Sequence, residues 1–184
     1  YYLLSKKFGS DVGKNWGNMN SVLGLPMAVL GMKKYSFGPA LLFDICSATW
    51  RYFFYQLPKI LVLEFGIDKP SEMEILLDTV TPDIAVVTGI SEAHIEGLGS
   101  LETIKKEKGL IVEALEKNGV AILNRDDKNS AEIKLPLGTK KVLVGSGEAE
   151  IKYSDVENKL SGVNFKLKIR SEEAIINSKL IGQH

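Results

Sequence analysis

The sequence predicts an α/β fold, with a mostly parallel sheet flanked by helices and a small antiparallel β appendage near the C-terminus. Two short apolar runs, Ile84–Val87 and Val120–Leu123, are typical of buried parallel strands. Between them, apolar residues recur at helical spacing from about Leu101 to Lys117. This strand–helix–strand segment has the length that a right-handed crossover requires, and it indicates the α/β core.

The pattern of the sequence changes after Glu148, where polar and apolar residues begin to alternate. Such alternation indicates antiparallel strands with one solvated face. The expected strands are Ala149–Val156, Gly162–Ile169 and Ala174–Leu180, and a further parallel strand, Lys141–Gly145, precedes them. We therefore expect a single domain over residues 1–184, with a parallel core over 1–147 and an antiparallel meander over 148–184.

The first third of the chain mixes helical and turn-rich segments. Tyr1–Phe8 predicts the last turns of a helix, and Gly9–Asn15 predicts a polar loop. The apolar segment Val22–Leu30 predicts a second helix, which Asn20 or Ser21 would cap.

Aromatic residues are dense from Phe37 to Leu57, and this segment predicts a helix. Aromatic runs of this kind are more often core or interface than ligand-binding. Lys59–Gly66 predicts a buried strand. Ser71–Val80 predicts another helix. Ser71 and Glu74, three residues apart, would form a capping box at its start.

The composition excludes several classes of protein. The 184 residues carry 23 Lys+Arg and 23 Asp+Glu, and this balance gives no indication of nucleic-acid binding. The apolar span from Phe37 to Ile67 contains four charged residues and is too polar to cross a membrane. The single cysteine, Cys46, permits no internal disulfide and is typical of a reducing compartment, so we expect a cytoplasmic protein.

Polar side chains follow the expected strands at their carboxyl ends, where open parallel sheets bind ligands. Glu64, His94 and Asn124 each occupy such a position. A carboxylate and an imidazole at one sheet edge can hold a divalent cation. The alternatives are a strand-end carboxylate that reaches solvent and a loop histidine with a structural partner.

Lys108 lies in the middle of the apolar stripe of the crossover helix, between Ile104 and Ile111. Burying an unpaired ammonium group is unfavourable, so a lysine on this face suggests a function. The alternative is a lysine whose stem packs against the sheet while its amine reaches water.

Common phosphate-binding signatures do not occur in the sequence. It contains no G-x-x-x-x-G-K-[ST] loop, and no G-x-G-x-x-G follows a strand and opens a helix. No Cys/His spacing predicts zinc. Any loop that cradles a triphosphate therefore lies outside these residues.

Six segments, taken in order, resemble the central ATP-binding domain of the Mur ligases. They are Gly17-Asn18-Met19-Asn20 with Gly24 and Pro26, Leu63-Glu64-Phe65-Gly66, Thr88-Gly89-Ile90 through Ala93-His94 to Gly99-Ser100, Glu107-Lys108-Gly109, Leu123-Asn124-Arg125-Asp126-Asp127, and Gly182-Gln183-His184. They cover nearly the whole chain. Within the family, they are most similar to the branch that adds D-Ala-D-Ala to a UDP-muramoyl tripeptide.

The resemblance implies a role for each residue of the candidate site. Glu64 and His94 would hold Mg²⁺, and Lys108 would be carbamylated to an anionic group that positions the metal, with Lys108 and His94 as the catalytic residues. Asn124 would contact the adenine of ATP, with Asp126 or Asp127 near the ribose. Asn18 and Asn20 would lie on the substrate and phosphate side.

The implied reaction is the transfer of the ATP γ-phosphoryl group to a substrate carboxylate, followed by attack of an amine on the acyl phosphate. The implied partners are a UDP-muramoyl-peptide and D-Ala-D-Ala or another amino component, and we expect a monomer. The phosphate loop and the N-terminal and C-terminal domains of the family would lie outside this chain. We therefore expect residues 1–184 alone to be inactive.

Gly89 stands where the family usually has asparagine. This departure, together with the missing phosphate loop, leaves two alternatives open. One is another Mur or folylpolyglutamate synthetase-like ligase. The other is a non-catalytic module that keeps the fold and binds a nucleotide or a partner.

Overall fold

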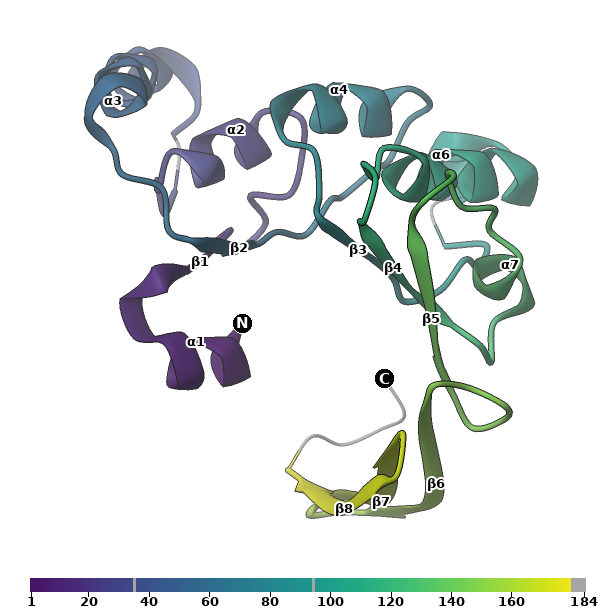
Figure 1. Ribbon diagram of the computed structural model, residues 1–184. Coiled ribbons are helices and arrows are strands. Elements are labelled where there is room, and N and C mark those ends of the chain that lie inside the picture. The colour runs from purple at the N-terminus through teal and green to yellow at the C-terminus, as the bar shows by residue number, and fades with distance from the viewer. Residues whose placement is uncertain (35, 94, 180–184) are drawn as a thin grey trace. The chain divides into compact units, whose positions relative to one another are not determined.

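The computed structural model describes residues 1–34, 36–93 and 95–179 (Figure 1). Contacts divide the chain into two compact units, Tyr1–Val80 and Thr81–His184. Each unit is built around parallel strands, and each is treated separately below. The proposal of one domain with an internal boundary near residue 147 stays a prediction.

The first unit holds a pair of parallel strands, β1 (Val12–Lys14) and β2 (Ile60–Val62), in which Val12 pairs with Ile60. Its helices are α1 (Tyr2–Phe8), α2 (Gly24–Val29), α3 (Leu41–Phe54) and α4 (Glu72–Thr79), with 3₁₀ turns at Gly9–Asp11 and Gly38–Ala40. The prediction of a loop over Gly9–Asn15 was wrong. A strand of three residues with a glycine at its centre is too short to show a period.

The core beside α2 is small and rich in methionine. Buried Met19, Met27, Ala28 and Met32 form a cluster, against which Leu41 and Ala48 of α3 pack. Ser21 orients the start of α2, because its hydroxyl accepts a hydrogen bond from the Gly24 N–H at 3.3 Å and its carbonyl accepts one from Leu25 at 2.8 Å. Leu23, however, stands at the N-cap position and no side chain caps the helix, so the predicted cap at Asn20 or Ser21 was wrong.

Helix α4 begins differently from the prediction. Ser71 has a left-handed conformation with φ of 68° and makes no side-chain capping bond, so the capping box was wrong. Instead, the Glu72 carboxylate accepts hydrogen bonds from the backbone N–H groups of Asp68 and Lys69, at 2.7 and 2.9 Å. The helix buries Met73 and Leu76 as its inner face.

The second unit contains a sheet in the order β3-β4-β5-β6-β7-β8. Pairing is parallel from β3 to β6 and antiparallel from β6 to β8, which confirms the predicted fold class. The strands are β3 (Ile84–Val87), β4 (Val120–Asn124), β5 (Lys140–Gly145), β6 (Ile151–Lys159), β7 (Gly162–Ile169) and β8 (Glu172–Ser178); the helices are α5 (Ile95–Leu98), α6 (Leu101–Glu113) and α7 (Lys128–Ala131).

Helix α6 is the crossover between β3 and β4, and it packs against β3 (Figure 1). Ser100 caps its start by accepting a hydrogen bond from the Thr103 N–H at 3.1 Å. The core of this unit buries Ile104 and Val112 of the helix with Ala85, Val87, Ala121 and Leu123 of the strands. In β3, however, Ile84 and Val86 are exposed, so the expectation that this strand is buried on both faces was wrong.

We expect Leu123→Ala to destabilise the chain by about 2–5 kcal/mol, because Leu123 is 0% exposed and its removal leaves a cavity at the centre of the sheet. Urea unfolding at neutral pH measures the change. The matched control is Leu137→Ala, since Leu137 is 99% exposed and the same truncation should change stability by less than about 0.5 kcal/mol. Equal effects in the two variants would contradict this account of the core.

Candidate functional site

The carboxyl ends of β1 and β2 bring Asn15, Asn20 and Glu64 together. The Asn20 amide donates a hydrogen bond to Glu64 Oε1 at 2.8 Å. Asn15 holds the Glu64 backbone on both sides, because its Nδ2 donates to the Glu64 carbonyl at 3.1 Å and its Oδ1 accepts from the Glu64 N–H at 3.2 Å. These bonds fix one carboxylate, itself exposed, at the edge of the strand pair.

Gly66 allows this arrangement. Its N–H donates to the Asn20 carbonyl at 2.8 Å, and a Cβ at position 66 would lie 2.9 Å from Asn20 Cγ. A larger residue would therefore push the asparagine away from Glu64. Asn18, which the sequence placed on the same side, is exposed and does not share in these contacts.

At the carboxyl end of β3, Lys108 extends from α6 to the loop Thr88–Ile90. Its Nζ donates a hydrogen bond to the Gly89 carbonyl at 2.8 Å, and the residue is half-buried. Burial lowers the pKa of Lys108, although the nearby Asp127 carboxylate opposes this effect. The amine is therefore directed at the loop, and the function that the apolar stripe suggested for Lys108 stays a prediction.

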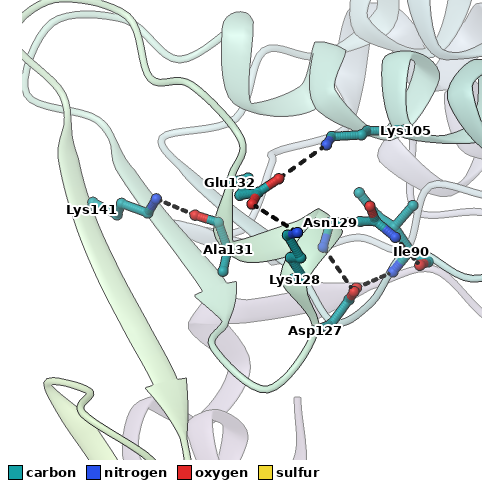
Figure 2. Close-up of polar contacts among 8 residues, drawn as sticks. All are labelled: Ile90, Lys105, Asp127, Lys128, Asn129, Ala131, Glu132 and Lys141. Atoms are coloured by element: carbon teal, nitrogen blue, oxygen red, sulfur yellow. Dashed lines mark hydrogen bonds and ion pairs between the residues drawn. The ribbon is translucent and has the colours of Figure 1, made fainter.

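The same loop is held from the end of β4. Asp127 caps α7 by accepting a hydrogen bond from the Asn129 N–H at 3.1 Å, and its other oxygen accepts one from the Ile90 N–H (Figure 2). Asn124 donates to the Thr88 carbonyl at 2.8 Å and accepts from the Asp126 N–H at 2.9 Å. These bonds lock the loops that follow β3 and β4 to each other.

Ion pairs surround the short helix α7. Glu132 lies 3.5 Å from Lys105 of α6 and 3.9 Å from Lys128, and Lys141 of β5 donates a hydrogen bond to the Ala131 carbonyl (Figure 2). The helix that Asp127 caps is therefore fixed to its neighbours on both sides.

Asp126 has different partners. Its carboxylate accepts hydrogen bonds from the Ser146 N–H at 2.8 Å, from the Ser146 hydroxyl at 3.0 Å and from the Tyr153 hydroxyl at 2.5 Å. The bond from Tyr153 is the main reason that the pKa of Asp126 lies below its usual range, and the carboxylate raises the pKa of Tyr153 in turn. Asp126 therefore joins β4 to the ends of β5 and β6.

Sequence reasoning missed three groups that shape this edge. Asn15 follows a strand too short to be recognised. Ser130 is completely buried, where its hydroxyl donates to the Val87 carbonyl and accepts from the Asn124 N–H. Glu107, next to Lys108, is a buried carboxylate. The sequence pattern that could have indicated Ser130 is its position three residues after Asp127, which caps α7.

Part of the predicted site lies beyond what the structure describes. His94 and the Gly182-Gln183-His184 segment fall outside the described residues. Glu64 belongs to the first unit and Lys108 to the second, so their convergence stays a prediction. Among the residues described, no group of three or more His, Cys, Asp or Glu side chains is placed to hold a metal ion.

Comparison with known proteins gives a consistent match. The family model for the Mur ligase middle domain matches residues 6–184. UDP-N-acetylmuramoyl-tripeptide–D-alanyl-D-alanine ligase of Buchnera aphidicola subsp. Baizongia pistaciae is 26% identical over 188 residues, covering 97% of this chain and 36% of the relative. The chain thus spans about a third of the length of this curated relative.

Solved structures agree in fold. A crystal structure of MurF from Acinetobacter baumannii superposes with a TM-score of 0.76 at 20% identity, over 97% of this chain and 34% of that one. The Thermotoga maritima MurF ligase in complex with ADP gives a TM-score of 0.62 at 19% identity, over 94% of this chain and 41% of that one.

No helix of the described residues is long and apolar enough to cross a membrane.

We expect Tyr153→Phe to raise the pKa of Asp126 toward its ordinary value, because the main hydrogen bond to the carboxylate is lost. A depressed carboxyl pKa stabilises the fold above the unfolded-state pKa, and this contribution is lost as the pH falls through the folded-state pKa. Tyr153→Phe should therefore destabilise the chain at neutral pH, by no more than about 1 kcal/mol because Asp126 is exposed.

The measurements are an NMR titration of the Asp126 carboxyl carbon and urea unfolding across the acid range. The difference from the unsubstituted chain should vanish once Asp126 is protonated. Tyr52→Phe is the matched control, since Tyr52 is exposed on α3 and should move neither quantity. An unchanged Asp126 titration in Tyr153→Phe would refute the bond.

Proposed function

Because this chain belongs to the Mur ligase middle-domain family, we propose that it is the central, ATP-binding part of an ATP-dependent amide ligase of peptidoglycan precursor synthesis. The observation that carries the proposal is the match, over nearly the whole chain, to ligases that add D-alanyl-D-alanine to a UDP-muramoyl tripeptide. The motif segments that the sequence singled out lie within that match.

In the proposed reaction, the γ-phosphoryl group of ATP passes to the carboxylate of a UDP-muramoyl peptide, and ADP leaves. The amine of D-Ala-D-Ala then attacks the carbonyl carbon of the acyl phosphate. An amide bond forms, inorganic phosphate leaves, and the amine loses a proton. The ADP complex of the Thermotoga maritima relative supports the nucleotide, and the cytoplasm, where ATP is available, is the proposed compartment.

Glu64 fits a magnesium ligand. One of its oxygens accepts the hydrogen bond from Asn20, which orients the carboxylate, and none of the residues that the structure describes binds the second oxygen. Mg²⁺ prefers oxygen ligands and commonly takes only one or two carboxylates with water and phosphate oxygens. When bound, the ion would neutralise charge on the transferring phosphoryl group. We assign Glu64, together with His94, as its protein ligands and Asn20 as the residue that positions the carboxylate.

Lys108 fits a site of carbamylation. The lowered pKa of its amine raises the fraction of the neutral form, which is the form that reacts with CO₂. A bond forms between Nζ and the CO₂ carbon, and the nitrogen loses a proton. The remaining N–H can keep the hydrogen bond to Gly89, while the new carboxylate supplies an anion at the sheet edge.

Asn124, Asp126 and Asp127 have their main hydrogen bonds within the protein. This pattern supports a positioning role, in which the aspartates fix the loops and Asn124 presents its remaining N–H to the adenine. Asn18, which is exposed, stays assigned to the substrate side.

Gly89 is the observation that favours the alternative of a non-catalytic module, since the family's usual asparagine is missing there. Packing does not require the glycine. Among the described residues, a Cβ at this position would meet Asp127 Oδ2 alone, at an ordinary 3.6 Å. The Gly89→Asn variant should therefore fold normally, and it allows the lost polar contact to be tested.

We expect a carbamate signal from Lys108 when the chain is incubated with ¹³C-bicarbonate and observed by NMR. The signal should grow as the pH rises toward the lowered pKa of the amine, because only the neutral amine reacts. Lys108→Ala should abolish it. Lys106→Ala, which removes an exposed lysine two positions away on the same helix, should leave it intact. A signal that survives in Lys108→Ala would contradict the assignment.

In the full-length protein, magnesium-dependent phosphate release should require the tripeptide precursor and the dipeptide together. We expect Lys108→Ala to reduce this release by about a hundredfold or more, as the loss of a charge-stabilising group does in other enzymes. Steady-state phosphate assays measure the effect, with Lys106→Ala as the control. No magnesium-dependent phosphate release in the presence of both substrates would support the non-catalytic alternative.

A further inference from the structure

The side chain of Asn15 continues the pairing of β1 with β2 beyond the point where the backbone of β1 stops. Backbone pairing of the two strands ends with Lys14 opposite Val62. Beyond this pair, Asn15 Nδ2 donates to the Glu64 carbonyl at 3.1 Å, and Asn15 Oδ1 accepts from the Glu64 N–H at 3.2 Å. A side-chain amide offers the same donor and acceptor as a peptide group. Asn15 therefore takes the place of a further residue of β1.

This replacement lets the main chain leave the strand pair while Glu64 stays fixed. The chain turns at Gly17, whose φ is 52°, and returns at Met19 and Asn20. Asn15 Nδ2 also donates to the Met19 carbonyl at 3.2 Å, and Met19 is buried in the methionine cluster. The loop is thus fixed on both sides, and the Asn20 amide reaches Glu64 Oε1 at 2.8 Å.

The half-buried amide of Asn15 has no N–H left for a ligand. A side-chain amide carries two N–H donors, and Asn15 uses them for the carbonyls of Met19 and Glu64. The opposite orientation of the amide would place its NH₂ group against the Glu64 N–H, so the hydrogen bonds determine which end is which. Asn15 is therefore suited to hold Glu64 and not to bind a substrate directly.

The contacts of Glu64 are with neutral groups. Two asparagine amides supply its hydrogen bonds, and none of the ion pairs within residues 1–34, 36–93 and 95–179 involves it. Lys14, which precedes Asn15, places its Nζ over the rings of Tyr1 and Trp16, 4.8 and 4.5 Å from their centroids. The carboxylate is therefore oriented without being neutralised, as a ligand for a divalent cation should be.

We propose that Asn15 is a positioning residue of the magnesium site and acts through the main chain of Glu64. Its two bonds to the backbone fix where Glu64 stands, and Asn20 fixes how the carboxylate is turned. Partners that orient a metal ligand are commonly worth about 10- to 100-fold in metal affinity. This inference rests on the proposed function, because it requires Glu64 to bind Mg²⁺.

The experiment measures binding of Mn²⁺, as a probe for Mg²⁺, to the full-length protein by electron paramagnetic resonance of the free ion. Asn15→Leu keeps the shape of the side chain and removes every hydrogen bond. We expect it to weaken Mn²⁺ binding by about tenfold or more, and we expect Glu64→Gln to weaken it further because the charge is lost. Asn15→Ser, which is too short to span both backbone groups of Glu64, should weaken it as well.

Two further measurements distinguish positioning from a general loss of structure. In Asn15→Leu, the Mg²⁺ concentration that half-saturates phosphate release should rise, whereas the KM for the tripeptide precursor should stay the same and excess Mg²⁺ should restore the rate. Hydrogen exchange of the Glu64 amide, followed by NMR, should become faster, because its acceptor on Asn15 is gone.

Two control variants should keep the Mn²⁺ affinity of the unsubstituted protein. Asn158→Leu makes the same substitution at an exposed position of β6, in the other unit. Leu76→Val shortens a side chain of α4 that is 0% exposed, so it lowers the stability of the unit that holds Glu64 without removing a contact to it. Urea unfolding gives the stability of each variant.

The variants separate failure of this inference from failure of the metal assignment. Mn²⁺ binding that is weakened in Glu64→Gln but unchanged in both Asn15 variants would overturn the role of Asn15 alone. Unchanged binding in Glu64→Gln would overturn the metal assignment and, with it, this inference. A loss in Leu76→Val as large as that in Asn15→Leu would attribute the effect to stability and overturn the positioning role.

Discussion

The tie between the loops that follow β3 and β4 is the constraint on which the second unit depends. Asp127 binds the Ile90 N–H, Asn124 binds the Thr88 carbonyl, and the buried Ser130 hydroxyl bridges the ends of both strands. Parallel strands bring these loops to one edge, but polar groups set their conformation. The carbonyl of Gly89 is thereby held within reach of Lys108. It accepts a hydrogen bond from the half-buried amine, which compensates for the water that burial excludes.

The strongly periodic elements were predictable from sequence. β3 has the predicted bounds, and the crossover and the meander lie where the patterns indicated. The elements that were predicted wrongly have local causes. β1 is too short for a period, and α4 starts with a glutamate that binds preceding backbone groups in place of a serine cap. The outward face of α3 could not be predicted, because an aromatic run has the same pattern whether it faces the core or solvent.

The sequence placed the candidate residues near the carboxyl ends of strands but did not give their contacts, and the roles assigned to them stay predictions. Glu64 follows β2, and Lys108 of α6 reaches the loop that follows β3. The sequence could not show that Asn20 holds Glu64, because the two are 44 positions apart and only the close approach at Gly66 brings them together. Nor could it show that Asp126 binds Ser146 and Tyr153. Long-range hydrogen bonds depend on how the strands pair, which no local pattern encodes.

The junction between β5 and β6 has a consequence for the cooperativity of the second unit. These strands pair through two residue pairs, Val144 with Ile151 and Gly145 with Lys152, and most of β8 is exposed. The three-stranded meander is thus joined to the helix-covered strands by few backbone pairs. Such a segment can open as its own foldon, with amide hydrogens that exchange long before those of β4.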